Sequence, residues 1–276
     1  MRGLSSIGSG ILTSLLVWTV SADVRAGELP ERWKRAEFAV GGYLATFGSD
    51  LRIDGNDGNL GTVIDLENTL NLDSDRYTFW LDGYWRFFDR HRLELSYYDV
   101  SREGTRTLNE QVVIRDEVFD IGVSVASSID LKVGKIAYAY SILQNDQWDG
   151  SLSLGVSAFD FQTSIQARID GVGSTQRSTS ELFAPLPTVG ARLWYAFADD
   201  WTARLEGNFF ALEFDEYNGS LIDAEAAIDY DVTDWFGLTL GYNYVNIDVD
   251  RTGGDFDAAI RYQYSAIILA ARRFLN

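Results

Sequence analysis

The chain has 276 residues, 46% of them hydrophobic and 14% aromatic, and its mean hydropathy is −0.10. The formal net charge of −18 argues against a nucleic-acid partner, which needs a basic face, and the absence of cysteine leaves stability to a large core or a closed barrel. A bundle of membrane-spanning helices is excluded, because each helix needs ~20 mostly apolar residues and no run of that length follows residue 30.

The N-terminus has the pattern of a secretory signal peptide. Arg2 supplies the positive start, an apolar run follows, and two small-residue cleavage patterns end at Ala22 and Ala26. We therefore expect a signal peptide over 1–26 and a single domain over 27–276. An N-terminal membrane anchor fits less well, because hydroxyl residues interrupt the short apolar run.

Apolar and polar residues alternate in the segments that follow, which predicts strands with one apolar face. The opening strand, at about 36–48, is rich in glycine and its two faces are not distinguished by the sequence. Every second residue is apolar in the later segments, which are 79–87, 93–97, 136–142, 152–158, 189–197, 203–209, 222–232, 238–244 and 260–268. The count is about ten strands.

Four short turns separate these segments, at 88–91, 145–148, 199–201 and 233–235. The apolar faces carry almost no charge, as lipid contact requires, because an Arg or Lys at mid-membrane costs about 2–4 kcal/mol. A soluble sandwich would have to bury many Tyr hydroxyls that need partners. We therefore predict an all-β, transmembrane, antiparallel up-and-down β-barrel of about ten strands, with eight or twelve as alternatives.

Loop length sets the expected orientation, since periplasmic turns are short and external loops are long. Both termini are then periplasmic, and the external connections are 49–75, 101–128, 166–185, 215–220 and 250–255. Phe210 follows Phe209 out of phase, and Val245 follows Tyr244 in the same way. These changes indicate β-bulges or strands that continue beyond the bilayer. Segment 61–72 is either a strand extension or a plug.

Four segments resemble those of a largely uncharacterised group of proteobacterial outer-membrane barrels. They are 61–67 (GTVIDLE), 86–95 (RFFDRHRLEL), 241–244 (GYNY) and 261–264 (RYQY). The resemblance covers nearly all of the mature chain and implies the barrel fold and the Gram-negative outer membrane, without an activity for particular residues. Such barrels usually end on an aromatic residue, whereas here Leu275 and Asn276 follow Phe274.

The expected partners follow from this location. The barrel should contact outer-membrane lipid and lipopolysaccharide, and the barrel-assembly machinery should bind the C-terminal strand that ends at Phe274. Nucleic acid is not an expected partner, and no cofactor or metal is expected. The sequence around 54–59 (DGNDGN) superficially suggests a calcium loop, but Gly58 stands where a ligand is needed, so a turn is the better interpretation.

Catalysis is disfavoured because His91 is the only histidine and falls in a predicted periplasmic turn. A hydrolase or acyltransferase needs a base that titrates near neutral pH beside its nucleophile. The solvated-turn interpretation of His91 is favoured over a catalytic one. We therefore predict no catalytic residues.

The polar faces supply a set of charges that should line the lumen, where unpaired charges are costly. The candidates are Asp82, Arg86, Arg92, Glu94, Lys135, Arg192, Arg204, Glu206, Asp223, Glu225, Asp229 and Arg261. They form either a salt-bridge plug or the selectivity elements of a narrow pore for small solutes. The leading function is thus a passive pore or a structural membrane protein. The alternative is a surface-exposed binding or adhesion protein that acts through the acidic loops at 49–75 and 101–128.

Overall fold

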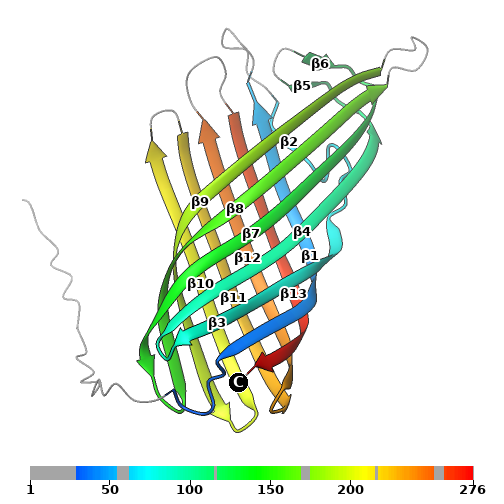
Figure 1. The fold of residues 1–276 in the computed structure, drawn as a ribbon. Helices are drawn as coiled ribbons and strands as arrows, with labels where there is room; N and C mark the ends of the chain where they lie inside the picture. The colour runs from blue at the N-terminus through cyan, green and yellow to red at the C-terminus, as the bar shows by residue number, and fades with distance from the viewer. Residues whose placement is uncertain are drawn as a thin grey trace, which may run out of the picture.

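The computed structural model describes residues 29–54, 62–114, 117–168, 175–214, 217–251 and 258–275, so the predicted signal peptide lies outside the described residues. Ten long strands of this part of the chain form one closed barrel (Figure 1). They are β1 (Ala36–Ile53), β3 (Asp75–Phe88), β4 (His91–Thr107), β7 (Ser124–Gln144), β8 (Trp148–Arg168), β9 (Thr175–Ala198), β10 (Trp201–Phe214), β11 (Tyr217–Thr233), β12 (Phe236–Arg251) and β13 (Ala258–Leu275). None of the described residues forms a helix long and apolar enough to cross a membrane.

Each long strand pairs antiparallel with the next one along the chain, and the first and last strands close the sheet. The closing pair runs from Ala36 opposite Leu275 to Ile53 opposite Ala258. Closure removes the free edges that an open sheet would present. The prediction of an all-β up-and-down barrel of ten strands is confirmed. The remaining strands are short: β2 (Ile64–Asp65) pairs with β1, and β5 (Val112–Ile114) pairs with β6 (Glu117–Phe119).

The four predicted short turns all lie at the end of the barrel where β1 begins and β13 ends (Figure 1). We call this the turn end and the opposite one the loop end. Side chains fix these turns, since Asn145 Oδ1 accepts the N–H groups of Gln147 and Trp148, both at 2.9 Å. Aromatic pairs mark the outer surface here, with Trp148 stacked on Tyr195 at 4.1 Å between ring centroids.

In the half of the barrel nearer the turn end, the apolar faces point outward. The predicted apolar sets over 79–87, 93–97, 136–142, 152–158, 189–197, 203–209, 222–232 and 238–244 all face out of the barrel. Their polar neighbours face the interior. Alternation therefore assigned the two faces of eight strands correctly.

The face assignment for β13 was wrong. Tyr262, Tyr264, Ala266 and Ile268 were expected to face outward, but all four are buried inside the barrel. Leu269 and its outward neighbours take the exposed face instead. The physical reason is that the barrel interior is itself apolar at this level, so this strand has apolar residues on both faces and its alternation is ambiguous.

The half nearer the loop end reverses the polarity of its two faces. Asp99, Lys132 and Asp160 lie side by side in register on the outer surface, while Leu131 and Val133 are buried inside. The strands simply continue, so that β4, β7, β8 and β9 include much of what was expected to be long loops.

The bulge interpretation of the phase changes is therefore wrong. Strand β12 stays in register with β11 and β13 through Tyr244 and Val245, and β10 stays in register with β11 through Phe209 and Phe210. Val245 and Phe210 are buried inside the barrel. The sequence changes phase there because the interior changes from polar to apolar, while the backbone geometry stays the same.

Segment 62–74 precedes β3 in the chain. It occupies the part of the barrel wall between β1 and β4 that β3, which begins only at Asp75, does not reach. It is bonded on one side to β1, where the Phe47 N–H donates to the Ser74 carbonyl at 2.8 Å, and on the other to β4, where the Asp73 N–H donates to the Glu103 carbonyl at 3.3 Å. Gly104 permits this approach, because a Cβ there would lie 2.3 Å from the Asn71 carbonyl oxygen. Ile64–Asp65 extend the sheet as β2, and the leucines of the segment pack inside the barrel, so the segment combines the two expected roles, strand extension and plug.

Two apolar clusters fill the interior of the loop half. The larger one, which we call the aromatic layer, spans the barrel at mid-height and includes Tyr43, Trp80, Tyr98, Tyr264 and Ile268. The second lies nearer the loop end, where leucines of segment 62–74 pack against β7.

The pairing of β9 with β10 stops before the loop end. It reaches only as far as Val189 opposite Phe209, since prolines at 185 and 187 cannot donate to a ladder.

The filled lumen as candidate functional site

At the turn end, residues 29–35 fold under the barrel mouth and form what we call the strap. Trp33 is buried, and its indole Nε1 donates to the Asn145 carbonyl at 2.6 Å. Its ring packs against Trp194 at 5.9 Å between centroids, and Trp194 in turn packs against Tyr84 at 5.2 Å. Arg32 donates to the carbonyl of Asp199 at 2.8 Å, which ties the strap to the turn between β9 and β10. The strap therefore covers the mouth of the barrel at the turn end.

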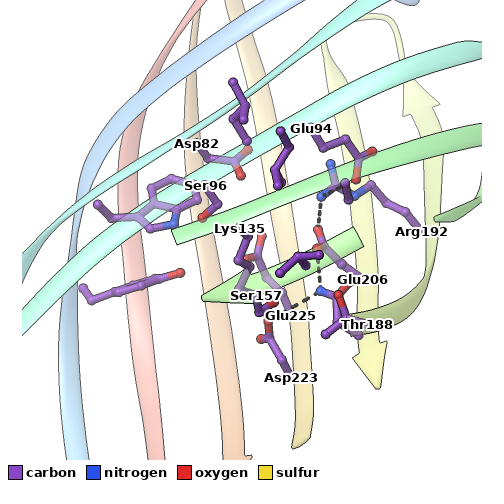
Figure 2. Close-up of a pocket in the computed structure, with 17 residues that line it drawn as sticks. Asp82, Glu94, Ser96, Lys135, Ser157, Thr188, Arg192, Glu206, Asp223 and Glu225 are labelled. Carbon is purple, nitrogen blue, oxygen red and sulfur yellow. Dashed lines mark hydrogen bonds and ion pairs between the residues drawn. The ribbon is translucent and has the colours of Figure 1, made fainter. Parts of the chain in front are cut away.

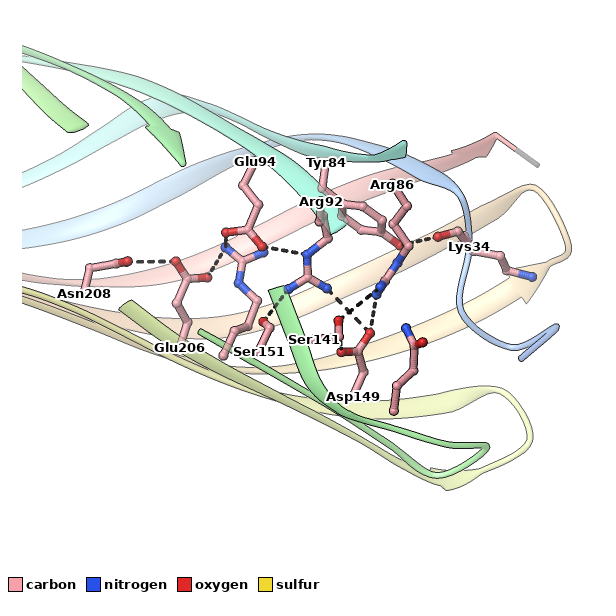
Figure 3. A network of polar contacts seen from close by, with 12 residues as sticks. Lys34, Tyr84, Arg86, Arg92, Glu94, Ser141, Asp149, Ser151, Glu206 and Asn208 are labelled. Atoms are coloured by element: carbon pink, nitrogen blue, oxygen red, sulfur yellow. Dashed lines mark hydrogen bonds and ion pairs between the residues drawn. The ribbon is translucent and has the colours of Figure 1, made fainter. Parts of the chain in front are cut away.

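Above the strap lies a layer of buried ion pairs centred on Asp149 (Figure 3). The Arg86 guanidinium pairs with the Asp149 carboxylate, and the Ser141 hydroxyl donates to the same group at 2.8 Å. Arg92 lies 3.6 Å from Asp149 and stacks its guanidinium 4.6 Å from the centroid of the Trp194 ring. Two arginines thus share one carboxylate, with an aromatic ring beneath them.

The same layer continues across the lumen as a chain of alternating charges. Arg92 Nε donates to Glu94 at 2.7 Å (Figure 3). Arg192 lies 3.4 Å from Glu94 and 2.5 Å from Glu206. The amide of Asn208 donates to Glu206 at 2.9 Å. Each carboxylate in this chain therefore has a cation or a hydrogen-bond donor, as burial requires.

A second chain lies on the other side of the barrel, between β10 and β1. Arg204 is 2.9 Å from Asp229, and Arg272 is 3.6 Å from Asp229 and 3.1 Å from Glu37. The Thr239 hydroxyl donates to Asp229 at 2.7 Å. These contacts link β10, β11, β12, β13 and β1, which are consecutive strands of the barrel wall.

A polar hollow of about 530 Å³, measured together with adjoining solvent, separates this charged layer from the aromatic layer (Figure 2). Lys135 pairs with Asp223 at its wall, and the Asn243 amide donates to Asp223 at 2.8 Å. Asp82 also lines the hollow, and its carboxylate forms no ion pair or hydrogen bond with any residue that the structure describes.

All the predicted lumen residues but one face the interior. The exception is Arg261, whose side chain is 70% exposed on the outer surface, 3.7 Å from Asp248. The prediction for Arg261 was wrong for the same reason as the rest of β13: the tyrosines beside it fill an apolar interior instead of facing lipid. The others meet in the two chains and the hollow, and whether they select a solute stays a prediction.

Several interior charges were missed by sequence reasoning. Asp149 could have been found, because it has the same phase as Ser151 on β8. Arg272 could not, because Arg273 follows it and the faces of β13 are ambiguous. Glu37 belongs to the glycine-rich opening strand, whose faces the sequence did not distinguish.

Arg102 forms a further buried pair that was missed, near the loop end. Its guanidinium pairs with Glu67 of segment 62–74, donates to the Asp73 carbonyl at 2.9 Å and lies 4.6 Å from the centroid of the Phe47 ring. The Glu67 carboxylate also accepts the Ser49 N–H at 2.9 Å. These contacts fasten the segment between β1 and β4.

His91 begins β4 on the outer surface near the turn end. Its Nδ1 is 2.7 Å from the Tyr138 hydroxyl, and its ring lies between 5.1 and 5.9 Å from the rings of Phe87, Phe88, Tyr138 and Tyr140. It closes the predicted turn at 88–91, where it pairs with Phe88, and it is also part of an aromatic cluster on the outer surface. Among the described residues, no carboxylate or aliphatic hydroxyl forms a hydrogen bond or ion pair with its ring.

The fold resembles solved outer-membrane barrels, while no protein-family model and no curated protein sequence matches the chain. The outer membrane protease OmpT from Escherichia coli aligns with a TM-score of 0.56 and 8% identity over 87% of this chain and 96% of that one. The translocator domain of the autotransporter NalP from Neisseria meningitidis gives 0.49 and 10%, over 87% and 88% of the chains. OprG from Pseudomonas aeruginosa gives 0.41 and 11%, over 90% and 100%. The chain has the fold of outer-membrane β-barrel proteins.

Proposed function

We propose that this protein is an integral outer-membrane barrel with a closed lumen and a structural, non-conducting role. One observation carries the proposal: the lumen is occupied at successive levels by the strap, the charged layer, the aromatic layer and the leucines of segment 62–74. A barrel of about this strand number lies between one that side chains fill and one that leaves a channel. Here side chains obstruct the lumen at several levels.

The energetics of the charged layer support the closed state. Separating one partner from a buried ion pair costs about 3–5 kcal/mol, because the other charge is left without compensation. A conducting path along the lumen would have to disrupt several of the pairs formed by Arg86, Arg92, Arg192 and Arg204. It would also have to displace buried side chains of the aromatic layer. Both steps oppose a stable open pore.

We place the turn end in the periplasm and the loop end outside a Gram-negative cell. Two features of the turn end support this orientation: it carries the short turns, and the first barrel strand begins there while the last one ends there. The polar outer surface of the loop half supports it as well. The apolar outer band would then contact lipid and lipopolysaccharide, and the barrel-assembly machinery would bind the terminus of β13 at Phe274.

Planar-bilayer recording of the refolded protein tests the proposal. We expect no steady current from the wild-type barrel, whose folding is checked by its heat-sensitive migration in detergent gels. Arg192→Ala and Arg204→Ala, which act within the charged layer, are recorded beside Arg261→Ala as the matched outer-surface control. Steady, ion-selective currents that change in the two lumen variants but not in the control would contradict the closed-lumen proposal and show that the protein is a pore.

A second candidate function is surface binding through the loop half. It is favoured by the polar outer faces of β4, β7 and β8, which continue for roughly 8 to 12 residues beyond the apolar band, or about 26–40 Å of strand. Replacing residues 108–123 with a short turn would remove the connection between β4 and β7. Adherence of expressing cells to immobilised extracellular-matrix proteins should then fall to background while the barrel still folds; unchanged adherence would exclude this connection as the binding element.

We also propose that the protein has no hydrolytic activity, as its sequence suggested. The aromatic surroundings of His91 support this, because a general base must reach its nucleophile by a hydrogen bond. Incubation with peptide and phospholipid substrates should give no turnover above that of His91→Gln. Turnover that His91→Gln abolishes would contradict the proposal.

A further inference from the structure

The polar hollow between the charged layer and the aromatic layer has more carboxylates than cations in its lining (Figure 2). The five carboxylates are Asp82, Glu94, Glu206, Asp223 and Glu225, and the two cations are Lys135 and Arg192. Glu206 and Glu225 lie directly opposite each other on neighbouring strands. Like charges in this position destabilise a sheet. A closed lumen needs only side chains that fill it, so the closed-lumen function does not account for this excess.

The excess remains when the ion-pair partners of the lining are counted as well. Following every ion pair outward from the hollow, until no described residue is added, gives nine carboxylates against six cations, an excess of three. The added groups are Arg86, Arg92, Arg204 and Arg272 together with Glu37, Asp149, Asp229 and Asp231. The strap cations Arg32 and Lys34 would not remove the excess even if both were added. Uncompensated charge of this kind is costly inside a protein.

Three side chains that bear oxygen atoms line the hollow without a partner among the described residues. The Asp82 carboxylate forms no ion pair or hydrogen bond. The hydroxyls of Ser157 and Thr188 form no hydrogen bond either, although these residues are only 2% and 6% exposed. Figure 2 shows all three at the wall of the hollow. Buried polar groups are normally paired in native proteins, so these oxygens indicate an occupant of the hollow that interacts with oxygen.

The charge and spacing of these groups select the class of occupant. A positive charge is needed to offset the carboxylate excess. Among the described residues, no three His, Asp or Glu side chains cluster closely enough to hold a metal ion directly, whereas Ca²⁺ takes about 6–8 oxygen ligands in direct contact. A monovalent cation fits better, because water molecules around it can bridge to oxygens that lie further apart. The rings of Tyr43 and Trp80 also line the hollow, and aromatic rings attract cations.

We propose that the polar hollow holds one small monovalent cation, together with water molecules bound to it, beside Asp82. The cation offsets part of the carboxylate excess, and its water molecules donate hydrogen bonds to the Ser157 and Thr188 hydroxyls. The charged layer and the aromatic layer lie on either side of this position. The ion is therefore a component of the folded barrel, which the closed-lumen function does not require.

The stability of the barrel at constant ionic strength measures this binding, because a ligand of the folded state stabilises it. The protein is folded into vesicles in mixtures of sodium chloride and the chloride of N-methyl-D-glucamine, a bulky cation. Raising sodium to about 100 mM should raise the urea midpoint by about 0.5–1.4 M, for a dissociation constant on the order of 10 mM. Asp82→Asn should abolish most of this rise. Asp99→Asn, on the outer surface, is the matched control and should keep it.

Two further variants separate ion binding from a purely structural role. Ser157→Ala removes a hydroxyl that has no partner in the protein, so it should not lower the urea midpoint without sodium, but it should reduce the rise that sodium causes. In detergent micelles the indole N–H resonance of Trp80, assigned by its loss in Trp80→Phe, should shift saturably with sodium. The Trp148 resonance, from the outer surface, should not move.

The same measurements contain the outcomes that would overturn the proposal. Equal urea midpoints at all sodium concentrations would mean that protons, and not a cation, offset the carboxylate excess. A sodium effect that persists unchanged in Asp82→Asn would mean that the ion acts elsewhere on the protein. If Asp82→Asn does not fold, the Trp80 resonance decides: a saturable sodium shift that is weaker in Ser157→Ala supports the site, and identical shifts in that variant and the wild type contradict it.

Discussion

The two halves of this barrel use the same backbone with opposite side-chain chemistry. Nearer the turn end the outer surface is apolar and the lumen holds buried ion pairs, such as that of Arg86 with Asp149. Nearer the loop end the outer surface carries rows of charges, such as Asp99 with Lys132, and the interior is an apolar core. The strands pass from one half to the other without a register shift at the boundary.

This contrast shows what the surroundings of each half must be. Side chains alternate between the two faces of a strand throughout, so only the solvent outside can explain why the faces exchange polarity. An apolar exterior is stable against lipid, and a polar exterior around an apolar core is stable in water. The turn half therefore has the build of a membrane barrel, and the loop half that of a soluble one.

The largest expected effect comes from breaking the charged layer of the turn half. Asp149→Ala leaves Arg86 and Arg92 without their shared carboxylate in a site where Asp149 is fully buried. We expect the free energy of unfolding to fall by about 3–5 kcal/mol. Denaturant titration in lipid vesicles, followed by tryptophan fluorescence, measures this change.

A double variant makes that result specific to charge. In Arg86→Met with Asp149→Leu both charges disappear and apolar groups replace them, so most of the lost stability should return. If the double variant is as unstable as Asp149→Ala alone, packing and not charge compensation would explain the loss, and the account of this layer would fail.

The next effect concerns the aromatic layer of the loop half. Ile268 is fully buried, whereas its neighbour Leu269 is 62% exposed on the outer surface. Ile268→Ala should lower the free energy of unfolding by about 2–5 kcal/mol, because it leaves a cavity as well as losing apolar contact. Leu269→Ala, the matched control, should cost less because no cavity forms. A larger loss of stability for Leu269→Ala than for Ile268→Ala would mean that Ile268 faces outward and Leu269 inward, as the sequence suggested.

That pair of residues also shows how far the sequence can predict the structure. Alternation identified ten strands, their turns and the outward faces of eight of them, since one face of each is apolar and the other polar. It failed at Ile268, where both faces are apolar, because no single-sequence pattern distinguishes lipid from a core. Contacts such as that of Arg102 with Glu67 depend on where an irregular segment folds, which alternation does not describe.

A third test compares the outer surfaces of the two halves directly. Leu205 points outward in the apolar band, and Thr105 points outward in the loop half. Leu205→Lys should lower the free energy of unfolding in vesicles by about 2–4 kcal/mol, as for a lysine at mid-membrane. Thr105→Lys should change it by about 0.5 kcal/mol or less, like other exposed substitutions. Equal costs for both would place the loop half in the membrane and remove the contrast.

The smallest expected effect is the most informative about Arg261. Its side chain is mostly exposed and lies 3.7 Å from Asp248, so Arg261→Ala removes only a surface ion pair. Exposed pairs contribute about 0–1 kcal/mol, and salt weakens them further. In the lumen the same substitution would cost about 3–5 kcal/mol, since its partner would be left buried and unpaired. A loss below ~1 kcal/mol that diminishes in 1 M salt therefore places Arg261 outside, and a large, salt-independent loss would return it to the lumen.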